Sequence, residues 1–91
     1  MDPELLRIAS RVTWWEAPER VVDREDVFLC RVMALATWED ARHVERIYGR
    51  ARLRAALQQA APGVFDPRSW HYWHHRVGLG PAGPLPARHL A

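Results

Sequence analysis

The chain has 91 residues and a formal net charge of +2; 48% of its residues are hydrophobic and 26% are charged. These values are typical of one soluble globular domain with a modest core. No apolar run approaches the roughly 20 residues that a membrane-spanning helix needs, and the first residues lack the basic and apolar regions of a signal peptide. The composition therefore excludes an integral membrane protein and predicts a cytoplasmic protein without a membrane partner.

Charge is distributed unevenly along the chain. Residues 1–49 hold seven arginines against ten acidic residues, a net of −3, whereas residues 50–91 hold six arginines against one aspartate, a net of +5. All 13 basic residues are arginine, which keeps its charge and forms bidentate contacts with carboxylates and phosphates. An acidic first half and a basic second half favour a role in partner recognition.

The chain begins with a short predicted helix followed by a loop. Asp2 is expected to cap this helix, because Pro3 suits the first helical position and apolar residues follow at Leu5, Leu6, Ile8 and Ala9. The predicted loop runs through Trp14, Trp15, Pro18, Val21 and Val22.

Asp23 is expected to cap the second helix, with Asp26 at its third position in a box-like arrangement. The predicted inner face is wide, which makes this the central and most buried helix; it consists of Phe28, Leu29, Val32, Met33, Leu35 and Ala36. Cys30 lies within the same apolar segment and is expected to be a small buried residue rather than a reactive thiol.

Two further helices are predicted over residues 37–48 and 50–60. Thr37 begins the first with acidic residues in its first turn, and Gly49 ends it. Its expected inner stripe is Ala41, Val44, Ile47 and Tyr48, and that of the next helix is Leu53, Ala56, Leu57 and Ala60.

A last helix is predicted to begin at Asp66-Pro67, with Trp70, Trp73 and Val77 on its inner stripe. From Leu79 onward, three prolines and two glycines predict an extended or mobile arm. The sequence thus predicts an all-α, compact single domain of four to five short helices over residues 1–79, followed by a Pro/Gly-rich tail over residues 80–91.

Five tryptophans are many for a chain of this size, because a small domain has little interior to enclose them. Trp70 and Trp73 fit the core, and Trp38 is expected to be half-buried at a helix entry. Trp14 and Trp15 are adjacent in a loop and cannot both point the same way. These two are therefore the first candidates for contact with a partner protein.

A series of arginines spaced by four gives a second set of candidate contacts: Arg42, Arg46, Arg50 and Arg54. On one continuous helix they would form a basic ridge able to bind phosphates. Gly49 is expected to interrupt that ridge, and arginines paired with acids on a solvated face explain the spacing equally well. Helices 38–48 and 50–60 could also form a helix-turn-helix, although the second helix offers few side chains that read base edges.

Three histidines near the C-terminus, His71, His74 and His75, are weak candidates for a metal site, because the i and i+4 positions can share one zinc ion. Further ligands would have to come from His43, His89 or a distant carboxylate. One packed and two surface histidines is the favoured interpretation, and no cofactor is expected.

Nothing in the sequence predicts an enzyme. Ser10 and Ser69 lack a nucleophile motif, and no glycine-rich phosphate loop is present. Asp40 and His43 could touch at i and i+3, but such a pair on an amphipathic helix is usually surface electrostatics.

Several short motifs resemble a family of small bacterial proteins. They are Trp14-Trp15-Glu16, residues 22–26, the run from Arg31 to Asp40, Ile47-Tyr48-Gly49, and the later aromatics Phe65, Trp70 and Trp73. The family pattern is an early Trp-acidic element, a helix of the form hxxRVhxhGxhxD and a Tyr-Gly or Phe-Gly helix end. The resemblance covers residues 14–79. Ala36 stands where the family commonly has glycine, and the tail has no counterpart.

Members of that family are encoded beside nucleotidyltransferase-type toxins related to abortive-infection systems. The resemblance therefore implies an antitoxin that silences such a toxin by direct binding, with no catalytic residue carried over. The candidate partner-binding residues are Trp14, Trp15, Trp38, Arg42, Arg46, Arg50 and Arg54. Two alternatives stay open: a small nucleic-acid-binding regulator that uses the basic C-terminal half, and a homo-oligomeric structural protein.

Overall fold

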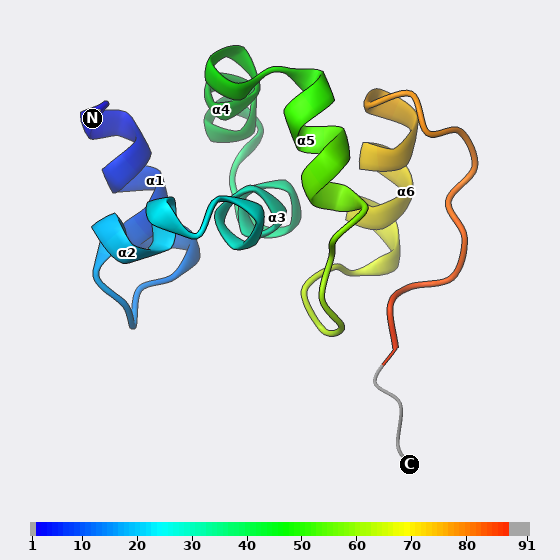
Figure 1. Ribbon diagram of the computed structural model, residues 1–91, viewed down its shortest axis with the longest axis horizontal. Coiled ribbons are helices and arrows are strands. Elements are labelled where there is room, and N and C mark those ends of the chain that lie inside the picture. The colour runs from blue at the N-terminus through cyan, green and yellow to red at the C-terminus, as the bar shows by residue number, and fades with distance from the viewer. Residues whose placement is uncertain (1, 88–91) are drawn as a thin grey trace.

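The computed structural model describes residues 2–87, and every regular element in that range is a helix (Figure 1). The helices are α1 (Pro3–Val12), α2 (Pro18–Asp23), α3 (Glu25–Leu35), α4 (Trp38–Tyr48), α5 (Arg50–Leu57) and α6 (Pro67–Arg76). The all-α prediction is therefore confirmed. The predicted number of helices was too low, because residues 2–87 contain six.

Three predicted helix starts are confirmed by capping hydrogen bonds. In each, a side-chain oxygen accepts a hydrogen bond from a backbone N–H two or three residues later, at 2.7–3.2 Å. The three caps are Asp2, Thr37 and Asp66. Each cap satisfies a backbone donor that has no partner within its helix, which fixes where the helix begins.

The additional helix is α2, where the sequence predicted a loop. Its N-cap residue, Ala17, has no side-chain acceptor, and six residues are too few for apolar periodicity to be recognised. Val21 and Val22 are buried, and α2 packs against both α1 and α3. Tertiary packing therefore stabilises a helix that its β-branched residues do not favour.

The predicted cap at Asp23 is wrong. Asp23 is the last residue of α2, and Arg24 takes the N-cap position of α3 without a side-chain capping bond. Because one residue joins the two helices, Asp23 is not available to cap α3. Asp26 instead forms an ion pair of 2.7 Å with Arg52 on α5.

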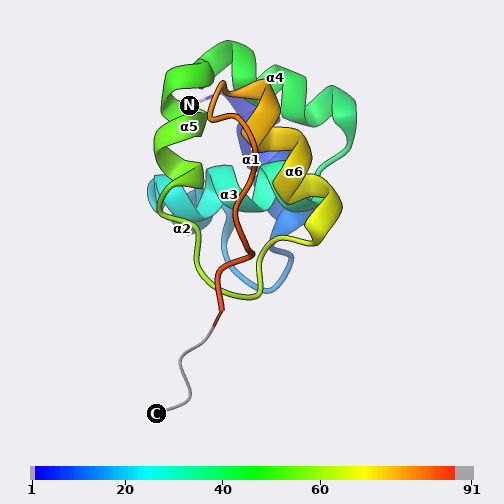
Figure 2. The same ribbon diagram turned by 90° about the vertical axis from the view of Figure 1, so that its right-hand side faces the viewer.

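The central position predicted for the second helix is confirmed, because α3 packs against all five other helices. Figures 1 and 2 show α4 above α3, with α1 and α2 on one side of it and α5 and α6 on the other. The largest fully buried side chains come from α1, α2, α3, α4 and α5; among them are Ile8, Val21, Phe28, Leu29, Val44, Leu53 and Leu57.

Two residues predicted to face the core are exposed. Leu35 is 61% exposed and Ile47 is 45% exposed. Each lies in the last turn of its helix, beyond the last residue that the helix buries, which is Met33 in α3 and Val44 in α4. The other predicted residues at these helix ends, Ala36 and Tyr48, do pack against the core, so the prediction was wrong for Leu35 and Ile47 alone.

Cys30 is buried, as predicted for a small core residue. Its thiol donates a hydrogen bond to the backbone carbonyl of Ala56 at 3.2 Å, which links α3 to α5. Burial raises the pKa of the thiol to about 11, so the reactive thiolate is scarce at neutral pH.

A buried carboxylate joins α1 to α4. Asp40 accepts a hydrogen bond from Arg7 Nη2 at 2.8 Å, and Arg11 lies 3.5 Å from its other oxygen. The side chain of Asp40 is 9% exposed but that of Arg7 is 42% exposed, so the carboxylate is shielded from solvent and the guanidinium is not. His43 does not pair with Asp40, because its Nε2 lies 3.1 Å from Oδ2 of Asp2.

Residues 79–87 form no helix or strand and lie against the core. Leu79, Ala82 and Leu85 pack on it, and the Gly83 carbonyl accepts a hydrogen bond from the Trp70 indole at 2.9 Å. The rest of the predicted tail, residues 88–91, lies outside the described residues, and the predicted boundary at residue 79 stays a prediction.

Within residues 2–87, no helix has the length and apolar character that crossing a bilayer requires.

Candidate protein-binding surface

The most exposed aromatic side chains lie in the loop between α1 and α2. Trp14 is 80% exposed and Trp15 is 57% exposed. Their rings meet edge to face with centroids 5.6 Å apart. Large apolar groups of this kind are rarely left in water on a monomer, and tryptophan is enriched at binding hot spots.

This loop is held in place by Arg31 from α3. The Arg31 guanidinium lies 5.3 Å from the centroid of the Trp15 ring, and its Nη1 donates to the Thr13 hydroxyl at 2.8 Å. Thr13 is fully buried, and an ion pair between Arg24 and Glu16 holds the end of the loop. Contacts with Arg31 of α3 therefore hold the loop that carries the two exposed rings.

The exposed face of α3 adds further apolar side chains to the two rings of the α1–α2 loop. Val27, Arg31 and Leu35 recur every fourth residue and so lie along one side of the helix. Figures 1 and 2 show the α1–α2 loop and the α5–α6 loop both below α3. A hollow of about 140 Å³ lies between α3 and the α5–α6 loop; α3 contributes Val27 and Arg31 to its lining, and the loop contributes Gln59, Ala61 and Val64. We call the set Trp14, Trp15, Val27, Arg31 and Leu35 the Trp14–Trp15 surface.

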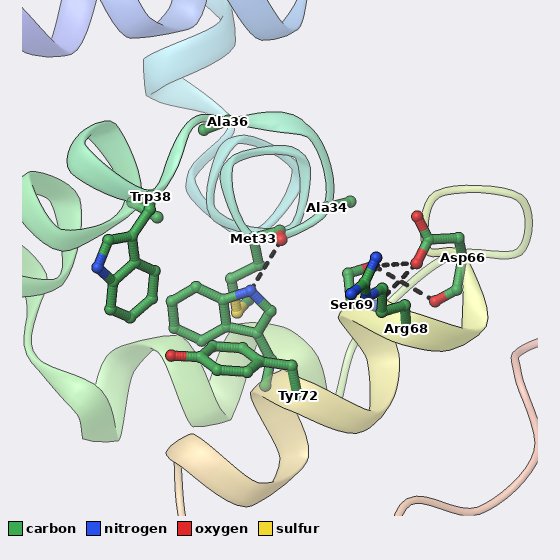
Figure 3. A pocket seen from close by; sticks show the side chains of 10 residues that line it. Met33, Ala34, Ala36, Trp38, Asp66, Arg68, Ser69 and Tyr72 are labelled. Atoms are coloured by element: carbon green, nitrogen blue, oxygen red, sulfur yellow. Dashed lines mark hydrogen bonds between the residues drawn. The ribbon is translucent and has the colours of Figure 1, made fainter.

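An apolar groove of about 680 Å³ lies between the end of α3, the start of α4 and α6 (Figure 3). Met33 and Trp73 form its floor, and the Trp73 indole donates to the Met33 carbonyl at 2.8 Å. Small side chains, Ala34, Ala36 and Ala41, keep it open.

Trp38 and Tyr72 lie at one end of this groove and Asp66, Arg68 and Ser69 at the other (Figure 3). Hydrogen bonds from the Ser69 N–H and hydroxyl lower the pKa of the Asp66 carboxyl. The groove therefore has an apolar middle and one polar end, which suits an apolar side chain of a partner better than a small charged ligand.

Trp38 is 48% exposed, in agreement with the half-buried position predicted for it. Its ring meets that of Tyr72 edge to face at 5.6 Å, and the Arg76 guanidinium lies 4.8 Å from its centroid. Arg76 also donates twice to Glu45, at 2.7 Å each, and this pairing lowers the pKa of the Glu45 carboxyl.

The predicted arginine ridge is interrupted at Gly49, whose φ of 87° separates α4 from α5. Arg42 and Arg46 lie with Trp38 on α4 and line one shallow hollow with it. Arg50 begins α5 and lies 3.6 Å from Glu45, and Arg54 is exposed one turn further along α5. The structure therefore places three of the predicted partner-binding residues, Trp38, Arg42 and Arg46, together on α4.

The predicted tryptophan contacts fall into two places. The α1–α2 loop, with Trp14 and Trp15, lies on the side of α3 opposite α4, which carries Trp38 (Figures 1 and 2). The sequence did not identify three residues that contact the exposed tryptophans, Arg31, Tyr72 and Arg76. The spacing of Val27, Arg31 and Leu35 signals a separate face of α3, but only the fold shows that Arg31 supports Trp15.

The histidines do not converge. His74 is half-buried, with Nδ1 2.7 Å from the Trp70 carbonyl and its ring against that of Trp70, whereas His71 and His75 are exposed. Among residues 2–87, no three or more His, Cys, Asp or Glu side chains are placed to hold a metal ion together.

No family model, curated protein or solved structure matches the chain. The resemblance to the family encoded beside nucleotidyltransferase-type toxins therefore stays a prediction.

Proposed function

We propose that the protein acts without catalysis, by binding another protein through the Trp14–Trp15 surface, and that this partner is a nucleotidyltransferase-type toxin, which it neutralises. The observation that carries the proposal is the 80% exposure of Trp14 in a loop fastened to α3 by Arg31. The partner class comes from the family resemblance.

The energetics support binding through this loop. An exposed indole that becomes buried in a partner pocket contributes about 2–4 kcal/mol when it acts as a hot spot. A side chain that is already held loses little conformational freedom on binding. Arg31 and Thr13 fix the position of the loop before the partner arrives, so Trp14 and Trp15 can act as rigid anchors.

The groove between α3, α4 and α6 is a separate apolar region, because its lining includes Trp38 and Tyr72 and does not include Leu35.

Co-expression tests this proposal. We expect the neighbouring gene to encode a nucleotidyltransferase. The chain should restore growth to cells that express this product, and the two proteins should elute as one complex in size-exclusion chromatography. Trp14→Ala should weaken the complex about 30-fold or more, as expected for a hot-spot tryptophan.

Ile47→Ala is the matched control, because Ile47 is also exposed and apolar but lies on α4. It should leave the complex and growth rescue unchanged. The proposal is wrong if the wild-type proteins form no complex, or if light scattering shows a dimer of the chain that Trp14→Ala converts to a monomer, because a second copy would then cover the Trp14–Trp15 surface.

A further inference from the structure

A second surface, on the opposite side of α3, combines aromatic rings with arginines. Trp38, Arg42 and Arg46 recur every fourth residue on α4 and line a hollow of about 300 Å³. Arg50, Tyr72 and Arg76, together with His75, line a neighbouring hollow of about 430 Å³. The contact between the Trp38 and Tyr72 rings joins the two. We call the set Trp38, Arg42, Arg46, Arg50, Tyr72 and Arg76 the α4–α6 surface.

The charge of this surface is only partly compensated. Its four arginines lie near two glutamates, Glu39 and Glu45, which leaves a net charge of +2. Glu45 is engaged by Arg76 and, at 3.6 Å, by Arg50. Arg42 and Arg46 are exposed and form no ion pair within residues 2–87. Exposed guanidinium groups of this kind attract anions and suit phosphate oxygens.

The two rings are fixed in orientation by Arg76. Its guanidinium lies over Trp38, its Nη1 donates to the Tyr72 hydroxyl at 3.3 Å, and its Nε and Nη2 donate to Glu45. Trp38 is 48% exposed and Tyr72 42% exposed, so both rings keep area that a ligand can cover. Arg76 is therefore a positioning residue, whereas Arg42 and Arg46 are free to contact a ligand.

We infer that the α4–α6 surface binds single-stranded nucleic acid, with bases stacked on Trp38 and Tyr72 and phosphates on Arg42, Arg46 and Arg50. Aromatic rings between cations match a chain in which every base offers a flat face and every linkage carries a negative charge. In a duplex these faces are stacked on one another, so a single strand fits the rings better. An acidic protein segment would satisfy the arginines but would not use the rings for stacking.

The experiment uses the whole chain and fluorescein-labelled 12-nucleotide oligo(dT) and oligo(U), measured by fluorescence anisotropy. Three phosphate contacts give a salt slope of about −2 for a single strand, so affinity should fall about 20-fold between 50 and 200 mM salt. Trp38→Ala should weaken binding about 5- to 150-fold, the range for one stacked base. The double variant Arg42→Ala, Arg46→Ala should weaken binding and bring the slope to about −0.7.

Two matched controls separate this surface from general effects. Arg20→Ala removes an exposed arginine from α2, and Trp14→Ala removes an exposed tryptophan from the α1–α2 loop; neither should weaken oligonucleotide binding by more than about twofold. Absence of binding at 50 mM salt would overturn the inference. So would tighter binding of a labelled poly-glutamate peptide or of a 12-base-pair duplex than of the single strands. Because Trp14 lies outside the α4–α6 surface, failure of the toxin complex and failure of oligonucleotide binding are distinguishable.

Discussion

At the scale of single residues, Gly49 determines how α4 and α5 meet. Its φ of 87° and ψ of 155° lie in a region that residues with a Cβ rarely adopt. Gly49→Ala should lower the free energy of unfolding by about 1–3 kcal/mol. No atom lies within 4 Å of the added Cβ, so the loss would come from backbone strain and not from a clash. Urea denaturation followed by circular dichroism measures it.

Gly83→Ala is the matched control for that change. Gly83 also has open space where the methyl group of alanine would lie, but its φ is not positive. Its carbonyl bond to Trp70 uses the backbone and survives the substitution. The stability of Gly83→Ala should be unchanged or slightly raised, and equal stabilities of the two variants would contradict the strain argument.

At the scale of helices, local capping chemistry explains what could be predicted. Asp2, Thr37 and Asp66 fixed three helix starts because each cap bond joins residues two or three positions apart. The helix α2 has no such bond and owes its stability to burial against α1 and α3, which depends on residues distant in the sequence. For the same reason, the exposure of Trp14 and Trp15 could be expected from their loop, but the Arg31 side chain beneath them could not.

The link between α3 and the α1–α2 loop gives a prediction at this scale. Arg31→Ala removes the cation over Trp15 and the donor to Thr13. Residues 14–16 should become mobile on the nanosecond timescale, with backbone order parameters falling from about 0.85 to below about 0.6 in ¹⁵N relaxation. Arg20→Ala, which removes an exposed arginine of the adjacent helix, should leave them unchanged. A rigid loop in the Arg31→Ala protein would show that the rings do not depend on this anchor.

At the scale of the whole molecule, the exposed tryptophans come from two elements on opposite sides of α3: the α1–α2 loop lies below α3 and α4 lies above it (Figures 1 and 2). Trp14 and Trp15 contact each other and Arg31, whereas Trp38 lies among three arginines. The sequence places all three tryptophans in one class of candidate contacts, because their separation depends on how α4 packs over α3. The interruption of the arginine series at Gly49 could be predicted, and the structure accordingly has Arg42 and Arg46 on α4 and Arg50 and Arg54 on α5.

The ion pair between Arg7 of α1 and Asp40 of α4 makes the stability of the whole fold sensitive to acid. Arg7 lowers the pKa of the Asp40 carboxyl, chiefly by its hydrogen bond. A carboxyl whose pKa is lowered in the folded state stabilises the fold fully at a pH above its ordinary pKa of about 3.9. That contribution is lost as the pH falls below this value.

Asp40→Asn should therefore lower the free energy of unfolding by about 1–3 kcal/mol at pH 7, the range for a charge-assisted hydrogen bond, and by progressively less toward pH 2. Urea denaturation at pH 7, 5, 4, 3 and 2 measures the free energy of unfolding of the wild type and of Asp40→Asn. Glu39→Gln, on the exposed neighbour, should track the wild type within about 0.5 kcal/mol. A gap between wild type and Asp40→Asn that persists at pH 2 would mean that shape, and not the charge of Asp40, holds α1 on α4.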